Sequence, residues 1–358
     1  MNETHAGWPP HRGGEADADR DGCGCEKISV VIPNWNGAHW LRPCLDSLQA
    51  QSFSDFRVYV VDNASQDDSV ALMRRNYPWV TVIRNDENLG FAGGMNVGIA
   101  RARGELIAAL NNDTETDPDW LATLVAAMDA HPEAGTGASQ LMDFKDRDII
   151  DSLGDGYLPL GVSFKVGAGQ RYNVQSSAPC KVQSACAAAS VYRRAMLDEI
   201  GAYDTDFFAY MEDIDLGLRA QAAGYDCIFI PGAKVFHIGS ATSGGSASAF
   251  SIRQTVRNTY QVTLKNVPVV LLPFYLGLTL SAQLGAVLVS FVPGRLDWLG
   301  RHRGALFSGL WAAAREAPNS LRKRRALRQS RRRGLRSFVA ITFETFLLHR
   351  AIQRRYQR

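Results

Sequence analysis

Carboxylate side chains stand at the ends of apolar runs in this 358-residue chain, at positions where they could serve chemistry. Asp62 closes the run FRVYVVD, the tripeptide NND at 111–113 follows ELIAAL, and EDID at 212–215 follows an aromatic segment. Carboxylates at such places are typical of divalent-cation sites and of general bases. Each segment alone also fits a structural role, because Asp caps helices and NND favours turns.

The segment EDID stands at the start of a predicted helix, where the helix dipole stabilises negative charge. Asp215 and Arg219 lie four residues apart, so we expect them to pair on one helix face. Glu212 and Asp213 are adjacent and cannot share a face, so one can point at a reaction centre while the other is held structurally. His237 ends the run KVFH and is either a metal ligand or a half-buried histidine of the core.

Short β-branched runs alternate with helical segments from Ile28 onward, which predicts an α/β fold. The predicted strands are 28–32, 56–61, 80–83 and 105–110, and the predicted helices are 38–51, 65–76, 91–101 and a segment after Asp117. One helix between successive strands favours a mostly parallel, Rossmann-like sheet with helices on both faces. Ligands of such sheets bind beyond the carboxyl ends of the strands, where the carboxylates fall.

Glycines open the predicted helix in NLGFAGGMN at 88–96 and would let backbone N–H groups approach an anion. The segment is not GxGxxG, and the chain has no Walker lysine motif. Residues 143–177 are rich in Gly, Asp and Ser, which predicts an irregular binding loop or lid. Regular structure is expected again at 181–191, in a helix at 212–223 and in a strand at 227–230.

The formal net charge of +3 is divided unevenly along the chain. Residues 295–358 hold 17 Lys and Arg against 3 Asp and Glu, so the preceding body is acidic. Ten of these basic residues fall in 315–336, interleaved with apolar ones, which predicts a helix attracted to an anionic membrane surface. Nucleic acid would attract the same charge, but the neighbouring apolar run favours lipid, so we expect no nucleic-acid partner.

Residues 266–294 carry no charge, and a helix over 274–292 would be about 28 Å long, close to the thickness of a bilayer core. A buried core helix is the alternative, but such helices are seldom apolar on every face. A single crossing would export the basic tail against the positive-inside bias. The prolines at 268, 273 and 293 therefore favour a re-entrant or interfacial hairpin, and a peripheral or monotopic membrane protein.

The motifs PNWNG, VVDNAS, NLGFAGGMNVGI, LNND, YMEDIDLGLR and KVFH, taken in this order between residues 28 and 239, resemble family 2 inverting glycosyltransferases of the GT-A fold. They are most similar to the rhamnosyltransferase-like enzymes of bacterial surface-polysaccharide synthesis. On this basis we expect a disordered leader at 1–27 and a GT-A catalytic domain at 28–265. Residues 266–358 would form a membrane-associating apolar hairpin and a basic amphipathic helical tail.

The resemblance also implies roles for individual residues. Asp213 would be the catalytic base, with Glu212 as its neighbour in the family's ED pair. Asp113 would bind a divalent metal, Mg or Mn, and His237 would be a further metal ligand. Asn111 stands where the family's DxD motif has its first acid. The nucleotide sugar would contact Pro33, Asn36, Asp62, Asn88, Gly90 and Asn112.

The implied function is inverting transfer of a sugar from a dTDP- or UDP-linked donor to a polyprenyl-linked or nascent surface glycan, at the cytoplasmic face of the cell membrane. Rhamnose is the expected sugar, and galactofuranose or another hexose is the alternative. A nucleotidyltransferase would need a basic, glycine-rich triphosphate loop, which PNWNG is not. A non-catalytic membrane scaffold is a further alternative. The six cysteines show no zinc-ligand or disulfide spacing, which fits a reducing cytosol.

Overall fold

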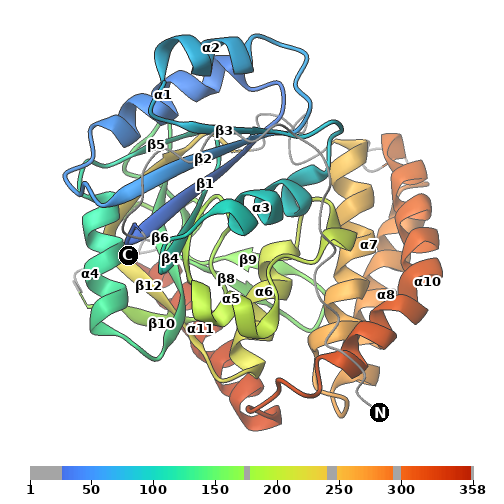
Figure 1. The fold of residues 1–358 in the computed structure, drawn as a ribbon. Helices are drawn as coiled ribbons and strands as arrows, with labels where there is room; N and C mark the ends of the chain where they lie inside the picture. Colours follow the sequence, from blue (N-terminus) through green and yellow to red (C-terminus); the bar gives the residue numbers. More distant parts are fainter. Residues whose placement is uncertain (1–25, 173–177, 240–247, 293–299, 356–358) are drawn as a thin grey trace, which may run out of the picture.

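The computed structural model describes residues 26–172, 178–239, 248–292 and 300–355 (Figure 1). Most of the predicted leader, residues 1–25, lies outside the described residues. Glu26 and Lys27 already contact the folded body. Glu26 is buried and accepts a hydrogen bond from the Ser29 hydroxyl at 2.6 Å. The Lys27 amine lies 2.8 Å from carboxylate oxygens of both Glu105 and Asp129.

The core of the fold is one twisted sheet. Its strand order is β10(Cys180–Val182), β12(Asp226–His237), β6(Ala134–Asp143), β11(Ala189–Arg193), β4(Leu106–Leu110), β1(Ile28–Asn34), β2(Phe56–Asp62) and β3(Thr81–Arg84). At the side, β5(Thr114–Thr116) pairs with β12 and β7(Ile150–Ser152) pairs with β6. The neighbours among β1, β2, β3 and β4 pair in parallel, as do β6 and β12, whereas β11 runs antiparallel to β4 and β6. The predicted mostly parallel sheet is therefore confirmed.

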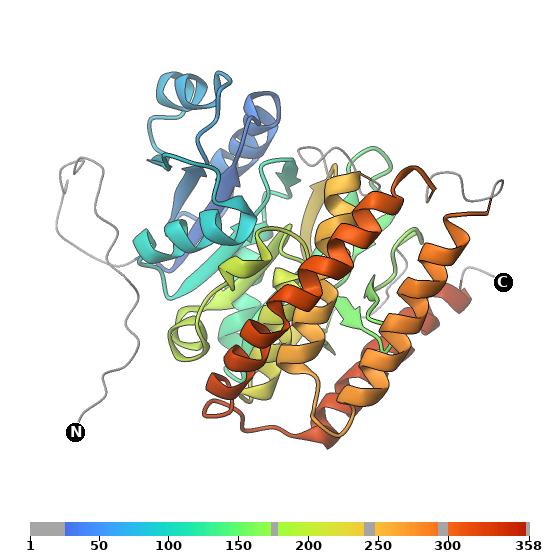
Figure 2. The ribbon, with the colours of Figure 1, turned by 90° about the vertical axis from the view of Figure 1, so that its right-hand side faces the viewer.

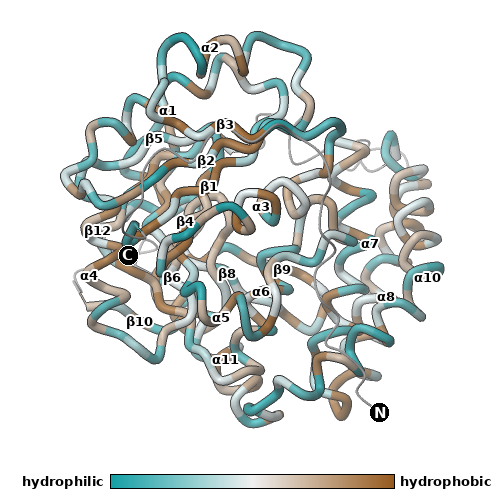
Figure 3. Tube along the Cα trace, in the orientation of Figure 1, coloured by the Kyte–Doolittle hydropathy of each residue, from teal (hydrophilic) through white to brown (hydrophobic). Residues whose placement is uncertain are grey.

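Helices cover both faces of this sheet, also as predicted (Figure 1). One face packs against α1(Ala38–Gln49), α2(Ser69–Asn76) and α4(Trp120–Ala130), and the other against α3(Gly90–Arg101), α5(Arg194–Ile200) and α6(Glu212–Ala222). In β1, Val30 and Ile32 face the first layer and Val31 faces the second. Because both faces are buried, these strands are continuous apolar runs, seen as the brown tube of β1 and β2 in Figure 3.

The region 143–177 is less irregular than its composition predicts. It contains β7 and a hairpin of β8(Asp155–Tyr157) and β9(Ser163–Lys165), while residues 173–177 lie outside the described residues. Strands of three residues are too short to show an alternating pattern, so the sequence could not reveal them. The predicted strand 227–230 and the strand KVFH are joined into one strand, β12. A register shift between Phe229 and Lys234 lets it run from Asp226 to His237.

The helix α2 begins at Ser69 rather than at Ser65. Ser65 does not cap the helix, because its hydroxyl accepts the backbone N–H of Asn36 at 2.9 Å. The Asp67 carboxylate instead accepts the backbone N–H of Ser69 at 3.1 Å. Ser65 thus shapes the loop after β1.

Four long helices, α7(Ala249–Asn266), α8(Leu272–Val289), α10(Arg303–Ala326) and α11(Leu335–Arg355), pack beside the sheet (Figure 2). By length and composition α8 is long and apolar enough to cross a membrane, and only 17% of it is buried. The expected hairpin turn is absent from this helix. Pro273 stands in its first turn, where proline is tolerated, and Pro268 precedes the helix. Pro268 and Pro273 therefore border α8 rather than break it, and Pro293 lies outside the described residues.

Much of the basic segment 315–336 binds the protein itself. Lys323 pairs with Asp206 at 2.6 Å, and the Arg324 guanidinium donates to the Leu264 carbonyl at 3.0 Å. Beyond α10, Arg332 pairs with Glu199 at 2.8 Å. The segment is therefore not a free cationic face, although α10 keeps exposed arginines.

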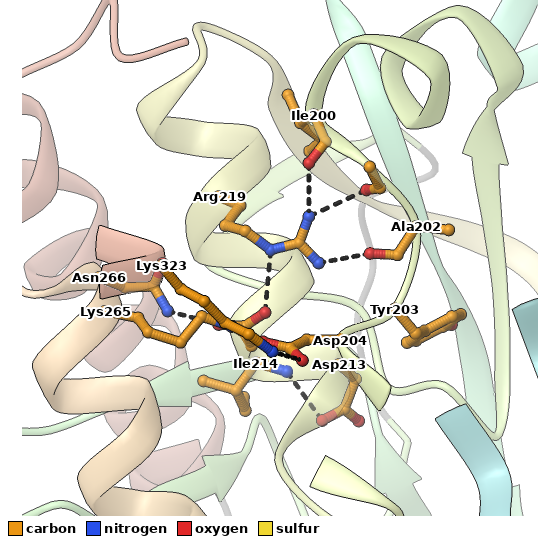
Figure 4. A network of polar contacts seen from close by, with 12 residues as sticks. Ile200, Ala202, Tyr203, Asp204, Asp213, Ile214, Arg219, Lys265, Asn266 and Lys323 are labelled. Carbon is orange, nitrogen blue, oxygen red and sulfur yellow. Dashed lines mark hydrogen bonds and ion pairs between the residues drawn. The ribbon is translucent and has the colours of Figure 1, made fainter. Parts of the chain in front are cut away.

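A buried polar network ties α6 to the C-terminal helices (Figure 4). Lys265, at the end of α7 and 2% exposed, lies 2.8 Å from a carboxylate oxygen of Asp215 and also pairs with Asp204. The expected pairing of Asp215 with Arg219 is confirmed at 2.9 Å. Burial alone would raise the pKa of Asp215, but the charges of Lys265 and Arg219 outweigh it and hold that pKa below its usual value. Asn266 donates to the same carboxylate at 2.7 Å.

We predict that Lys265→Met lowers the free energy of unfolding by about 3–5 kcal/mol, because it leaves two buried carboxylates without their shared cation. Urea unfolding followed by circular dichroism measures this difference. The matched control is Lys234→Met, at an exposed position, which should change the free energy by less than about 0.5 kcal/mol. Equal effects of the two substitutions would contradict the structural role of Lys265.

Candidate active site

A cleft of about 800 Å³ opens at the carboxyl ends of β1, β2, β4 and β12. The start of α6 and the strand β9 complete its wall. Most of the residues predicted from the sequence line it, namely Pro33, Asn88, Gly90, Asn112, Asp113, Glu212, Asp213 and His237. Segments more than 200 residues apart in the chain thus meet around one cavity, at the sheet edge where the sequence predicts a site.

Asp62 and Asn36 do not line the cleft but support its wall. The Asp62 side chain is fully buried and accepts hydrogen bonds from the Asn34 amide at 3.2 Å and from the Ser65 backbone N–H at 3.1 Å. The side-chain oxygen of Asn36 accepts the backbone N–H of Gln66 at 2.8 Å. Asn34, the last residue of β1, stands between Asp62 and the cavity and was not among the predicted site residues.

A hydrogen bond between two side chains connects the end of β1 with the loop after β4. The Asn112 amide donates to the Asn34 side-chain oxygen at 2.7 Å. This contact needs a glycine at position 37, where a Cβ atom would lie 2.2 Å from the Asn112 side-chain nitrogen. The glycine of PNWNG therefore permits the close approach of two loops that line the cleft.

Gly90, at the start of α3, has a φ of +71°, and a Cβ atom there would lie 2.5 Å from the Phe208 carbonyl oxygen. The same carbonyl accepts the backbone N–H of Ala92 at 3.1 Å. Asn88 accepts the backbone N–H of Gly90 at 2.9 Å. The first turn of α3 is thereby fixed against the segment that leads into α6.

A candidate metal site lies between the ends of β4 and β12. The Nε2 atom of His237 lies 3.5 Å from a carboxylate oxygen of Asp113, and both side chains are buried. The Nδ1 atom of His237 lies 2.8 Å from the Asp151 carboxylate. Burial alone would lower the pKa of His237, but hydrogen bonds to Asp113 and Asp151 outweigh it and raise the pKa to about 9.

These residues fit a divalent cation. A carboxylate and an imidazole suit Mn²⁺, and the outer carboxylate of Asp151 holds the ring by its other nitrogen, as is usual for metal-bound histidines. A bound cation would replace the proton that His237 now shares with the two acids. The donor set is incomplete without oxygen atoms from a ligand, which is usual for cations that bind together with phosphates.

The start of α6 holds Asp213 in place. Its carboxylate accepts the backbone N–H groups of Ala187 at 3.2 Å and Ile214 at 2.8 Å. Burial nevertheless raises the pKa of Asp213. Glu212 also lines the cleft, and burial and the charge of Asp213 raise its pKa well above the usual range. The two adjacent acids thus reach one cavity, which their sequence positions did not suggest.

The backbone that leads into α6 is strained. Phe208, Tyr210 and Met211 all have positive φ, at 62°, 70° and 69°. Each such residue costs about 1–3 kcal/mol unless its surroundings hold it there. All three residues line the cleft, as Asp213 does. The strained backbone therefore lies directly before the residues of α6 that reach the cavity.

Two functional candidates, Asp155 and Lys165, are missing from the sequence-based set. Asp155 is buried, accepts the Ser152 hydroxyl at 2.9 Å, and has its pKa raised to about 7 by burial and by the charge of Asp213. The Lys165 amine lies 2.7 Å from the Asp151 carboxylate. Its positive charge offsets part of the rise that burial causes in the pKa of Asp213. Both residues come from the β8–β9 hairpin, where no periodic pattern marked them.

A second group of potential ligand atoms belongs to Asp155, Cys186 and Asp213, which place them within 4.8 Å of one another. Cys186 would supply a soft sulfur donor, whereas Mg²⁺ and Mn²⁺ prefer oxygen ligands. The cation Lys165 also acts on both carboxylates. This group therefore fits Mg²⁺ or Mn²⁺ less well than Asp113 and His237 do.

Comparisons with known proteins identify a family and a fold. Residues 29–201 match the family described as Glycosyl transferase family 2. The N-acetylglucosaminyl-diphospho-decaprenol L-rhamnosyltransferase of Mycobacterium tuberculosis is 25% identical over 256 residues, which cover 65% of this chain and 82% of that protein. The chain spans between 18% and 47% of the length of several other curated relatives that it matches.

Solved structures show the same fold. S. aureus TarS 1-349 in complex with UDP has a TM-score of 0.51 and 16% identity, over 92% of this chain and 91% of the other. GalNAc-T7 with UDP, GalNAc and Mn²⁺ has a TM-score of 0.56 and 16% identity, over 82% and 57%. Together with the matched family, these findings show that residues 29–201 form a glycosyltransferase family 2 domain and that the chain has the GT-A fold.

Proposed function

We propose that this glycosyltransferase is an inverting enzyme that transfers a sugar, rhamnose in the first instance, from a nucleoside diphosphate to a lipid-linked or nascent surface glycan. One observation carries the proposal. A half-buried carboxylate held by two backbone N–H groups, Asp213, shares a single cleft with the Asp113–His237 pair. An inverting transfer needs these two functions, a base for the acceptor and a site for the leaving diphosphate.

The donor would lie with its nucleoside beside Asn34 and its diphosphate toward Asp113 and His237. A divalent metal bound there would neutralise the charge that develops on the departing diphosphate. Two structural neighbours, GalNAc-T7 and a mannosyltransferase from Pyrobaculum calidifontis, were solved with Mn²⁺. The imidazole in the donor set also supports Mn²⁺ over Mg²⁺ here.

Asp213 would accept the proton of the acceptor hydroxyl as its oxygen attacks the anomeric carbon and the bond to the diphosphate breaks. The carboxylate can do this only in its ionised form. Ala187, Ile214 and Lys165 stabilise that form, while burial keeps its pKa raised and so makes it a better base. The proton would then rest on Asp213 until it passes to solvent.

The acceptor would be a polyprenyl-linked glycan at the cytoplasmic face of the membrane. The decaprenol-linked acceptor named for the mycobacterial relative and the exposed apolar helix α8 support this assignment. Confining both partners to one surface would shorten the search and orient the attacking hydroxyl. Transfer of galactofuranose or another hexose is the alternative, because the cleft walls do not by themselves select the sugar.

We predict that Asp213→Asn lowers the transfer rate by about 10²–10⁴-fold, because the amide cannot take the acceptor proton. Donor binding should persist, because the nucleotide end of the cleft is unchanged. Radiolabelled sugar transfer to membrane lipid extract, after a screen of dTDP- and UDP-sugars by thermal shift with Mn²⁺, measures both quantities. The matched control is Asp198→Asn, at an exposed position on α5. Full activity in Asp213→Asn would rule out the assigned base.

We also predict a pH profile governed by the ionisation of Asp213. Activity should fall as the pH drops through its raised pKa, because protonation removes the base. Lys165→Met removes a charge that lowers this pKa, so the acidic limb should move to higher pH. The exposed Lys145→Met, in the same region of the chain, should leave the profile in place. Rates measured from pH 4 to 9 test this, and an unmoved limb in Lys165→Met would refute the electrostatic role.

A further inference from the structure

We propose that α8, α11 and the tip of the β8–β9 hairpin form one lipid-docking surface, on which the protein lies flat on an anionic bilayer with the cleft close to the lipid. Only the purpose of this surface, which is to bring the cleft to a lipid-linked acceptor, rests on the proposed function. Its physical basis is independent of catalysis and consists of exposed apolar side chains, their continuity with the cleft wall, and the arginines beside them.

The helix α8 supplies the centre of this surface. Phe274, Leu280, Leu284 and Leu288 recur at helical spacing and are 56%, 45%, 47% and 69% exposed. Ser281 is the exposed polar residue among the described residues of this helix. Protein–protein interfaces are on average little more than half apolar, whereas this helix face is almost wholly so. Lipid therefore fits this face better than a second protein does.

The inner side of α8 is attached to the protein, so the helix cannot cross a bilayer without leaving its place. The Tyr275 ring stacks on that of Tyr157 with centroids 6.2 Å apart. The Thr279 hydroxyl donates to the Pro159 carbonyl at 3.4 Å. A helix held along one side and apolar on the other lies in the membrane interface, parallel to its plane.

The hairpin tip joins this helix to the cleft. The turn is closed by the backbone N–H of Leu158, which donates to the Val162 carbonyl at 2.9 Å, and it exposes Leu160 and Val162 by 47% and 48%. The next three residues form β9 and line the cleft, ending at Lys165 beside the acids. An apolar surface on the tip is therefore only a few residues from the proposed proton-transfer group.

The helix α11 extends the surface on the other side of the hairpin. Its Phe338 ring lies 6.1 Å from that of Tyr275, and its Phe346 ring lies 6.3 Å from that of Phe164. Its outward positions combine apolar and basic side chains at helical spacing, namely Arg336, Val339, Phe343, Leu347, Arg350 and Arg354. Figure 2 shows α11 behind α8, beyond the β8–β9 hairpin.

The exposed arginines supply the attraction to anionic lipid. Each basic residue near such a surface contributes about 1 kcal/mol, and the exposed acid on α11 is Glu344. These arginines differ from those of 315–336 that bind the protein itself. Charge thus directs the chain to the leaflet, and the α8 side chains then insert.

Flotation of the full-length chain with vesicles tests the proposal. We expect it to bind vesicles of phosphatidylcholine with 30% phosphatidylglycerol more tightly than pure phosphatidylcholine. Leu284→Ser combined with Leu288→Ser should weaken binding at least tenfold, and Leu160→Ser combined with Val162→Ser should also weaken it. The control Trp79→Ser removes an exposed apolar side chain next to β3 and should bind as the unaltered chain does. Thermal unfolding checks that all variants are folded.

Undiminished vesicle binding in both double variants would overturn the proposal. So would a chain that ignores vesicles and forms a dimer, by light scattering, that the α8 variant converts to a monomer. Flotation needs neither donor nor acceptor, so its outcome is separate from that of the proposed function. A chain that docks as expected but transfers no sugar would contradict the proposed function alone.

Discussion

The structure depends on keeping neighbouring acids at the start of α6 in different electrostatic states. Asp215 is neutralised by Lys265 and Arg219 and fixes the helix to the layer behind it. Two residues earlier, Asp213 faces the cleft with partners that stabilise its ionised form only in part. A carboxylate can serve as a base only if its helix does not move toward a better partner. The anchored Asp215 would therefore keep Asp213 in the position that its proposed role as a base requires.

The C-terminal helices belong to the same constraint. The predicted domain boundary at 265–266 falls at the end of α7, where Lys265 and Asn266 both contact Asp215. The start of α7 supplies Phe250 to the cleft, and α10 binds the region of Asp204 through Lys323. A surface that docks on lipid through α8 and α11 would thus be rigidly linked to the catalytic helix. The same helices would then fix both the orientation of the protein on a membrane and the position of Asp213 in the cleft.

The sequence predicts the sheet and most of the cleft because those features follow local rules. Buried parallel strands are continuous apolar runs, and their carboxyl ends carry the polar residues, which locates Asp113 and His237. Asp213 was found instead from the acidic start of a predicted helix. Asp155 and Lys165 could not be found in this way, because short strands in a glycine-rich segment show no period. The sequence correctly places Asp62 at the end of a strand. It does not show whether this acid faces a ligand or a neighbouring residue, because that depends on the contact with Asn34, which is distant in the chain.

The charge pattern of the tail shows a similar limit. The count of basic residues in 315–336 predicts a cationic helix, yet acids far away in the chain bind several of them. The apolar run over α8 is more reliable, because no partner within the described residues covers its outer face. A count of basic residues is a weak predictor of function, because a fold can pair those charges with its own acids. A long apolar run that stays exposed is a better predictor, because proteins seldom expose a large apolar surface without a use.

On the proposed mechanism, the leaving diphosphate would lie at Asp113 and His237, and Asp213 would stand on the acceptor side of the same cleft. A crystal structure of the chain with UDP and Mn²⁺ would reveal this arrangement. We expect the cation against Asp113 and His237, with the diphosphate bound to it and the Asp213 carboxylate free to face the sugar position. A cation bound instead among Asp155, Cys186 and Asp213, or a nucleotide outside this cleft, would rule the arrangement out.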